Sequence, residues 1–229
     1  MYHIAGITGF WKPSEWVYAM VGKLCQHFNL PGPNPTSVKC CCDKFVQRQF
    51  LKNAAVPVPS FRLAANAADV QKYSAEIGLP VVLKPTVGQC SSGVRLCRTA
   101  DELTEHTTYL LREEHIWPSS PGILVEEFVN GPFLCAHLIG NELIGVSAGK
   151  LGPLPHFFSY ESIVPALLAK DQYKRIRDIS LDCLQALGLG WGPTNIDLLW
   201  TKRGPIVIEV NPRLGGAPDP QLIQLSIWY

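Results

Sequence analysis

The segment PIVIEVNPRLGG, residues 205–216, decides the fold because it combines an apolar strand with polar side chains at regular spacing. Successive side chains of a β-strand point to opposite faces of the sheet. The pattern therefore predicts an apolar face formed by Ile206, Ile208 and Val210. It predicts a polar face formed by Glu209, Asn211 and Arg213. A charge is costly to bury unless it is paired or bound to a metal, so the polar face indicates a binding site.

The strand before this segment, residues 194–200, predicts what lies opposite Glu209. If residues 202–204 form a three-residue hairpin loop, Gly204 takes the left-handed conformation that such loops need. The register that follows from this loop places Asp197 directly opposite Glu209. Like charges in that position destabilise a sheet, unless one acid is protonated or a cation lies between them.

Carboxylate and amide oxygens are hard ligands, and Mg²⁺ typically binds one or two carboxylates together with phosphate groups. The hairpin therefore predicts a magnesium site formed by Asp197, Glu209 and Asn211, with Mn²⁺ as an alternative metal. Arg213 is suited to hold an anionic group through its forked guanidinium. A solvated hairpin with ordinary surface acids is the alternative interpretation.

Composition bounds the class of protein. The chain has 229 residues, of which 47% are hydrophobic and 17% charged, with a net charge of +1. This balance is typical of a globular core, and the charge indicates neither a nucleic-acid nor a membrane partner. No apolar run approaches the ~20 residues of a membrane span, and no signal peptide is recognisable at the start. We expect a cytoplasmic protein, and a homo-oligomer is compatible with these properties.

The eight cysteines do not form a recognisable metal or disulfide pattern. No C-x-x-C pair occurs, which argues against zinc, so we expect free thiols of which several are buried. The consecutive Cys40, Cys41 and Cys42 point in three directions on a helix, and their spacing indicates no role.

Helices and strands alternate along the chain, which predicts an α+β (or α/β) fold with antiparallel hairpins. Helices are expected over residues 14–28, 36–54, 67–77, 99–114 and 166–187. Strands are expected over residues 60–64, 79–85, 94–97, 122–129, 194–200 and 205–210, with a hairpin over 133–149 that turns near Gly140.

Five motifs stand in an order that resembles the ATP-grasp superfamily. They are CDKFVQRQFLKNAAVPVP (42–59), GLPVVLKP (78–85), ILVEEFVNG (123–131), NIDLLW (195–200) and IVIEVNPRLGG (206–216). The resemblance covers about residues 14–216. Within the superfamily, GWGPTNIDL and EVNPRLGG most resemble the branch of L-amino-acid ligases and carnosine synthases, which joins an amino or carboxylic acid to an amine.

The resemblance implies an ATP-grasp fold in which two lobes hold ATP between them, preceded by the remnant of an α/β domain. The implied domains are residues 1–59 for the tail of the preceding domain and a linking helix, 60–130 for the small lobe, and 131–229 for a large lobe that is incomplete. By the family pattern, the chain is shortened at both ends.

The resemblance also implies roles for individual residues. Lys44 and Lys84 match two lysines that contact the phosphates, and loop 86–93 matches the mobile loop that covers them through backbone N–H groups. In that loop the binding positions are Gly88, Ser91, Ser92 and Gly93, fewer glycines than many relatives carry. The adenine-binding hinge corresponds to Glu126, Glu127, Phe128 and Val129.

The remaining matches concern the metal and the chemistry. Asp197, Glu209 and Asn211 match the magnesium ligands, and Arg213 matches the arginine that steadies the transferred phosphoryl group. Together with Lys84, Arg213 is the expected catalytic residue. Phe133 stands where relatives often have an acid that holds the ribose of ATP, so the ribose contact is not carried over.

The reaction implied by the resemblance is an ADP-forming ligation of small-molecule carboxylate and amine substrates, with ATP and Mg²⁺ as cofactors. The expected substrate region is residues 149–165, which contains His156, Ser159, Glu161 and Ser162. For His156 and Glu161, the alternative interpretation is that they are ordinary surface-loop residues. Two other functions remain open: a carboxylase-type enzyme that phosphorylates bicarbonate, and a nucleotide-binding module without turnover.

Overall fold

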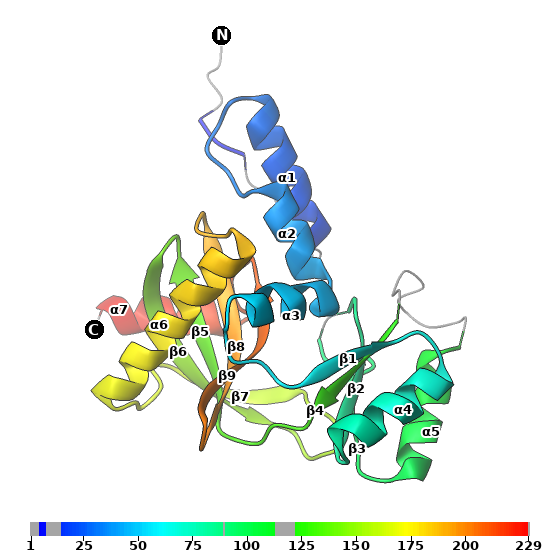
Figure 1. The fold of residues 1–229 in the computed structure, drawn as a ribbon. Coiled ribbons are helices and arrows are strands. Elements are labelled where there is room, and N and C mark those ends of the chain that lie inside the picture. Colours follow the sequence, from blue (N-terminus) through cyan, green and yellow to red (C-terminus); the bar gives the residue numbers. More distant parts are fainter. Residues whose placement is uncertain (1–4, 8–14, 89, 113–121, 229) are drawn as a thin grey trace.

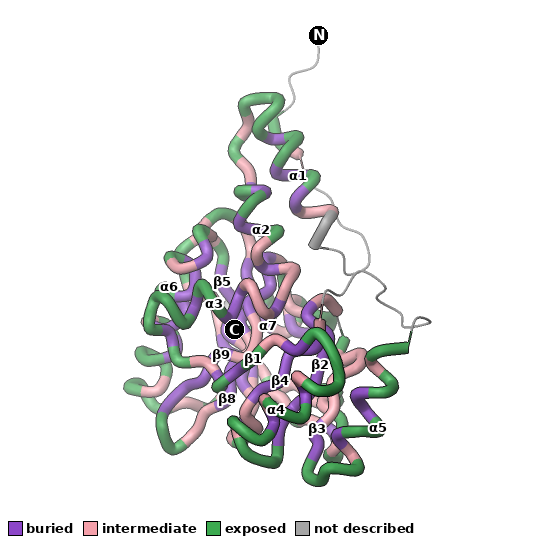
Figure 2. Tube along the Cα trace, turned by 45° about the vertical axis from the view of Figure 1, so that its right-hand side comes forward, coloured by how far each residue is buried: buried purple, intermediate pink, exposed green. Residues whose placement is uncertain are grey.

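The computed structural model describes residues 5–7, 15–88, 90–112 and 122–228. Two antiparallel sheets and the helices that cover them form its body, and α1 (Glu15–His27) and α2 (Pro35–Cys42) project from it (Figure 1). In Figure 2 the buried segments follow the strands and the inward faces of the helices, while α1 is largely exposed or intermediate. The fold is α+β, as predicted.

The first sheet has the strand order β1-β4-β2-β3. Its strands are β1 (Phe61–Ala64), β2 (Val81–Pro85), β3 (Arg95–Cys97) and β4 (Ile123–Glu127). Two helices, α4 (Ala67–Ile77) and α5 (Ala100–Leu110), pack on one face of this sheet around a buried apolar cluster. In β2, Val81 and Leu83 belong to that cluster, so the alternating Lys84 points to the opposite face.

The second sheet has the strand order β7-β6-β5-β8-β9. Its strands are β5 (Phe133–Ile139), β6 (Glu142–Leu151), β7 (Ser159–Ile163), β8 (Pro193–Thr201) and β9 (Gly204–Asn211). Helix α6 (Lys170–Leu187) covers one face through Ile176, Ile179 and Leu184, which pack against Leu134, Ile196 and Leu198. The α6 helix ends at Gly188 in the left-handed conformation.

The β8–β9 hairpin confirms the predicted acid pair, but the predicted loop is wrong. Thr201 pairs with Gly204 across a two-residue turn instead of a three-residue loop. Ile208 is an extra residue on β9, because Asp197 pairs with Glu209 while Leu198 pairs with Val207. This β-bulge shifts the register by one residue and offsets the shorter turn, so Asp197 and Glu209 still face each other.

The bulge also overturns the predicted apolar face of β9. Val207 and Val210 both belong to the core under α6, whereas Ile206 and Ile208 pack on the other side of the sheet, near Val129. Alternation fails here because the extra residue in a bulge switches the side to which the following side chains point. The predicted grouping of Ile206, Ile208 and Val210 is therefore wrong.

The predicted helix over residues 36–54 is two helices, α2 and α3 (Lys44–Asn53). Asp43 lies between them in an extended conformation and caps α3, accepting hydrogen bonds from the backbone nitrogens of Phe45 and Val46 at 2.8 and 3.0 Å. Aspartate is among the preferred N-cap residues, because its side chain competes with the helical backbone for hydrogen bonds.

Two elements of the structure were not predicted. They are strand β7, formed by residues 159–163, and helix α7 (Asp219–Trp228). The expected extension of α5 to residue 114 lies partly outside the described residues. All eight cysteines are free thiols, and four of them are buried, as expected. None of the described helices has the length and apolarity to cross a membrane.

Candidate active site

A cleft of about 950 Å³ lies between the two sheets and is lined by residues from both of them and from α3. Nearly all residues that the sequence singled out line it, from both sheets: Lys44, Lys84, Gly88, Ser91, Ser92, Glu126, Glu127, Phe128, Val129, Asp197, Glu209, Asn211 and Arg213. Of the residues predicted to contact ATP or the metal, Gly93 alone is not among the lining residues.

Two neighbouring rows of cross-strand pairs form the polar floor of the cleft. One row runs across four strands through Ser147, Cys135, Asp197 and Glu209. The next row runs through Gly145, His137, Asn195 and Asn211. Side chains in both rows share a face because they stand two residues apart along each strand. The strand pattern thus concentrates acids, amides and hydroxyls at one place.

The two acids of the floor are held differently. Burial and the neighbouring Glu209 carboxylate raise the pKa of Asp197 to about 6, although Cys135 and Asn195 donate hydrogen bonds to its Oδ1 at 3.2 and 3.0 Å. Burial by itself would raise the pKa of Glu209, but Lys44, together with the charges of Lys84 and Arg48, outweighs burial and holds that pKa below its usual range. The Lys44 Nζ lies 2.8 Å from Glu209 Oε1. A second cation beside Asp197 would relieve the remaining repulsion.

The donor set fits Mg²⁺. Asp197, Glu209 and Asn211 offer hard oxygen atoms, and the buried Oδ1 of Asn195 has no hydrogen-bond partner among the described residues. Within the same part of the chain, no three His, Cys, Asp or Glu side chains are grouped to hold a metal by themselves. Two carboxylates with amide oxygens are the kind of site in which phosphate groups complete the coordination of Mg²⁺.

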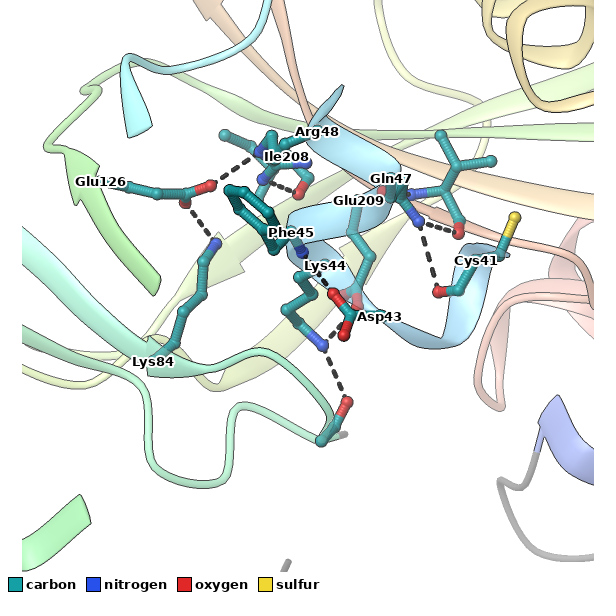
Figure 3. Close-up of polar contacts among 12 residues, drawn as sticks. Cys41, Asp43, Lys44, Phe45, Gln47, Arg48, Lys84, Glu126, Ile208 and Glu209 are labelled. Atoms are coloured by element: carbon teal, nitrogen blue, oxygen red, sulfur yellow. Dashed lines mark hydrogen bonds and ion pairs between the residues drawn. The ribbon is translucent and has the colours of Figure 1, made fainter. Parts of the chain in front are cut away.

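Lys84 and Lys44 reach the cleft from different elements. Lys84 forms an ion pair with Glu126, and burial lowers the pKa of its ammonium. Lys44 stands at the first position of α3, where its Nζ also donates to the carbonyl of Gly88 at 2.8 Å (Figure 3). Each ammonium group is paired with an acid. Because both lysines line the cleft, an anion bound there can contact them.

The loop over residues 86–93 and the following strand β3 contact the segment 152–158, which connects β6 to β7 of the other sheet. Ser91 Oγ donates to the carbonyl oxygen of Phe157 at 2.7 Å, and the nitrogen of Leu96 donates to the carbonyl of Pro155 at 3.0 Å. Gly93 turns away from the cleft with a φ of +72°, and its carbonyl lies 2.9 Å from His106 Nε2. Its position favours a role in the turn, because a positive φ is unstrained only for glycine.

The four residues Glu126–Val129, which were predicted to form the hinge, all line the cleft. The side chain of Glu126 is buried and points to Lys84 and Arg48, whereas Glu127 accepts from Arg203 Nη2 at 2.6 Å. Phe128 and Val129 add apolar side chains to the lining. An apolar wall with a few polar backbone groups is suited to a flat aromatic ring.

The predicted substrate region is partly at the cleft. Ser159, Glu161 and Ser162 are among the lining residues, and His156 is not. Glu161 forms an exposed ion pair with Lys150, with Nζ 2.7 Å from Oε1. Arg213 lies half-buried just beyond the end of β9 and lines the same end of the cleft.

Several polar residues near the cleft were missed. Gln47 and Arg48 are fully buried on α3, and Ser147, His137 and Asp219 form a buried hydrogen-bonded group in which Ser147 Oγ donates to Asp219 Oδ2 at 2.8 Å. The spacing of Lys44, Gln47 and Arg48 is the one available signal, because positions i, i+3 and i+4 share a helix face.

Comparison with known proteins agrees with this geometry. The family described as "ATP-grasp domain" matches residues 41–217. The chain is 56% identical over 225 residues to the uncharacterized protein y4rH of Sinorhizobium fredii, covering 98% of this chain and 46% of that protein. It is 30% identical over 231 residues to human carnosine synthase 1, covering 92% of this chain and 28% of the enzyme.

A solved structure gives the same result at the level of fold. The crystal structure of the L-amino acid ligase from Bacillus licheniformis superposes with a TM-score of 0.74 at 26% identity, covering 89% of this chain and 48% of the ligase. The chain therefore spans less than half the length of these three proteins.

Proposed function

The chain belongs to the ATP-grasp family, and we propose that it is an ADP-forming ligase that activates a carboxylate with ATP and joins it to an amine. One observation carries the proposal: Lys44 and Lys84 share a single cleft with Asp197 and Glu209. Cations and oxygen ligands that line the same cleft are what a metal–triphosphate complex requires. The relatives named carnosine synthase and L-amino acid ligase support amino acids as the substrate class.

ATP is proposed to lie between the two sheets, with residues 60–130 as the small lobe and 131–229 as the large one. Adenine stacks within the hinge Glu126–Val129, and its polar edge meets the hinge backbone. The phosphates extend toward Lys44 and Lys84 under loop 86–93, where Gly88, Ser91 and Ser92 line the cleft. Mg²⁺ bound by Asp197, Glu209 and Asn211 would neutralise negative charge on the phosphate oxygens.

The first chemical step forms an acyl phosphate. A carboxylate oxygen of the substrate attacks the γ-phosphorus of ATP, and the bond from that phosphorus to the β–γ bridging oxygen breaks to release ADP. Arg213 and Lys84 hold the transferred phosphoryl group and stabilise its charge. This step needs positioning and electrostatics instead of a nucleophilic side chain.

The second step forms the amide bond. The lone pair of the amine attacks the acyl carbon, the amine loses a proton, and inorganic phosphate leaves with the electrons of the broken carbon–oxygen bond. Water must be kept from the acyl phosphate during this step. Phe133, Phe157 and Phe158 line the cleft and provide apolar surface suited to that purpose.

Phosphate release tests the proposal. The purified chain is incubated with Mg²⁺, ATP and pairs of amino acids, and phosphate is measured beside the Glu209→Gln variant. Release that depends on both amino acids and is lost in the variant is expected. Mg²⁺-dependent binding of ATP without release for any pair would contradict the ligase and favour a nucleotide-binding module. Release that depends on bicarbonate alone would indicate the carboxylase-type reaction.

A further inference from the structure

The buried polar side chains of Gln47 and Arg48 have no part in the proposed chemistry, although both are 0% exposed. We propose that they are positioning residues, which hold the backbone of β9 so that Glu209 presents its carboxylate to the metal. The inference rests on the proposed function, since it assigns a support to a metal ligand of that site. It is argued from three contacts that one turn of α3 makes with three consecutive residues.

Gln47 holds the residue after Glu209. Its Oε1 accepts a hydrogen bond from the nitrogen of Val210 at 2.9 Å, and its Nε2 donates to the carbonyl of Val210 at 2.8 Å. Strand β9 is at the edge of its sheet, so these backbone groups have no neighbouring strand to pair with. The amide of Gln47 thus replaces a strand and fixes both backbone polar groups of Val210, which belong to the two peptide units that flank its Cα.

Arg48 holds the residue before Glu209. Its Nη2 donates to the carbonyl of Ile208, the extra residue of the bulge, and its Nε lies 2.7 Å from Glu126 Oε1 (Figure 3). A bulge leaves a residue without its regular partner in the ladder. Arg48 supplies a partner and at the same time connects β9 to the hinge strand β4.

Lys44 contacts Glu209 itself, with Nζ 2.8 Å from Oε1. Residues at positions i, i+3 and i+4 of a helix lie on one face, so a single turn of α3 meets the carbonyl of residue 208, the side chain of residue 209 and the peptide groups of residue 210. The α3 turn is fixed in its own right, because Asp43 caps it and the nitrogen of Lys44 donates to the carbonyl of Thr86 at 2.7 Å.

Burial of these groups is costly, which argues that they do more than fill space. A buried amide or guanidinium loses its hydration, and apolar side chains of similar volume are often equally stabilising or more so. The Nη1 of Arg48 is buried without a hydrogen-bond partner among the described residues. Groups around a metal ligand set its orientation, and their loss typically lowers metal affinity by about 10- to 100-fold.

The test compares Gln47→Met with the control Gln71→Met. Gln71 is an exposed residue of α4, and its side chain contacts Thr104 outside the cleft. ATP binding is titrated at several Mg²⁺ concentrations, and exchange of the Val210 amide hydrogen is measured in the free protein. For Gln47→Met we expect faster exchange at Val210 and about a tenfold rise in the Mg²⁺ concentration for half-maximal ATP binding. ATP binding without Mg²⁺ should change less than about twofold, and Gln71→Met should match the wild type.

The milder variant Gln47→Asn keeps the amide but withdraws it by one methylene, and we expect a smaller shift in the same direction if Gln47→Met does not fold. Faster exchange at Val210 with an unchanged Mg²⁺ requirement would overturn the inference, because the contact would be lost without consequence for the metal. Wild-type protein without Mg²⁺-dependent ATP binding would instead contradict the proposed function, and this inference with it.

Discussion

Asp197 and Glu209 face each other across one row of the sheet, yet only Glu209 has a lysine to balance it. The pKa of Asp197 is raised to about 6 by burial and by Glu209, so this acid is partly protonated near neutral pH without a metal. Its ordinary value is near 3.8. The folded protein therefore binds more protons than the unfolded chain between about pH 4 and 6.

This difference predicts how pH affects stability in the absence of Mg²⁺. The cost of ionising Asp197 is absent below pH 4, grows as the pH rises, and is complete above about pH 6. Asp197→Asn removes that cost. The gain in free energy of unfolding relative to wild type should therefore be about 2 kcal/mol larger at pH 8 than at pH 4. One pKa unit corresponds to about 1.4 kcal/mol, and partial exposure of the side chain reduces the effect. Urea unfolding at both pH values measures it.

The exposed Asp182 on α6 serves as the control, because Asp182→Asn makes the same substitution at a surface carboxylate outside the acid pair. The stability of Asp197→Asn relative to wild type should rise between pH 4 and pH 8. If it does not, ionisation of Asp197 does not carry the free-energy cost assigned to it.

At the scale of elements, the stability of α3 depends on the residue that caps its N-terminus. The Asp43 carboxylate accepts hydrogen bonds from two backbone nitrogens at the start of α3. Asp43→Ala should lower the free energy of unfolding by about 1 kcal/mol, the usual cost of losing an N-cap. Denaturant unfolding measures the change, with Asp182→Ala expected to shift stability by less than about 0.5 kcal/mol. Equal effects of the two variants would argue against the cap.

The elements also show what the sequence predicts and what it does not. Most helices and strands were predicted within a few residues, because apolar periodicity, caps and glycines mark them locally. The break at Asp43 was missed because Lys39 through Asn53 reads as one helical stretch, and only the extended backbone of Asp43 separates α2 from α3. A good N-cap residue inside a helical pattern is ambiguous.

For the β8–β9 hairpin, the predicted pairing of Asp197 with Glu209 was correct although the predicted loop was wrong. The turn is one residue shorter than predicted, and the bulge at Ile208 restores the register for Glu209. Bulges carry no dependable local pattern, because the partner that stabilises one can lie far away in sequence; here it is Arg48 on α3. The roles of Gln47 and Arg48 were missed for the same reason. Their spacing from Lys44 indicates a shared helix face, but it does not reveal a partner 160 or 163 residues away in the sequence.

At the scale of the whole molecule, the cleft exists because α3 and the segment around Phe157 connect the two sheets. Arg48 joins β9 to β4, and Ser91 joins the loop 86–93 to the segment that connects β6 to β7. Family resemblance predicted the ATP-grasp fold and brought the distant motifs together, which local patterns alone did not do.

Calorimetric titration of ATP into the chain, with and without Mg²⁺, beside Glu209→Gln, tests the metal–triphosphate site most directly. The variant removes one ligand charge and relieves the acid pair, so it should remain folded. The account predicts ATP binding that strengthens with Mg²⁺ in the wild type and loses this dependence in Glu209→Gln. Equal Mg²⁺ dependence in both proteins, or no ATP binding by the wild type, would contradict it.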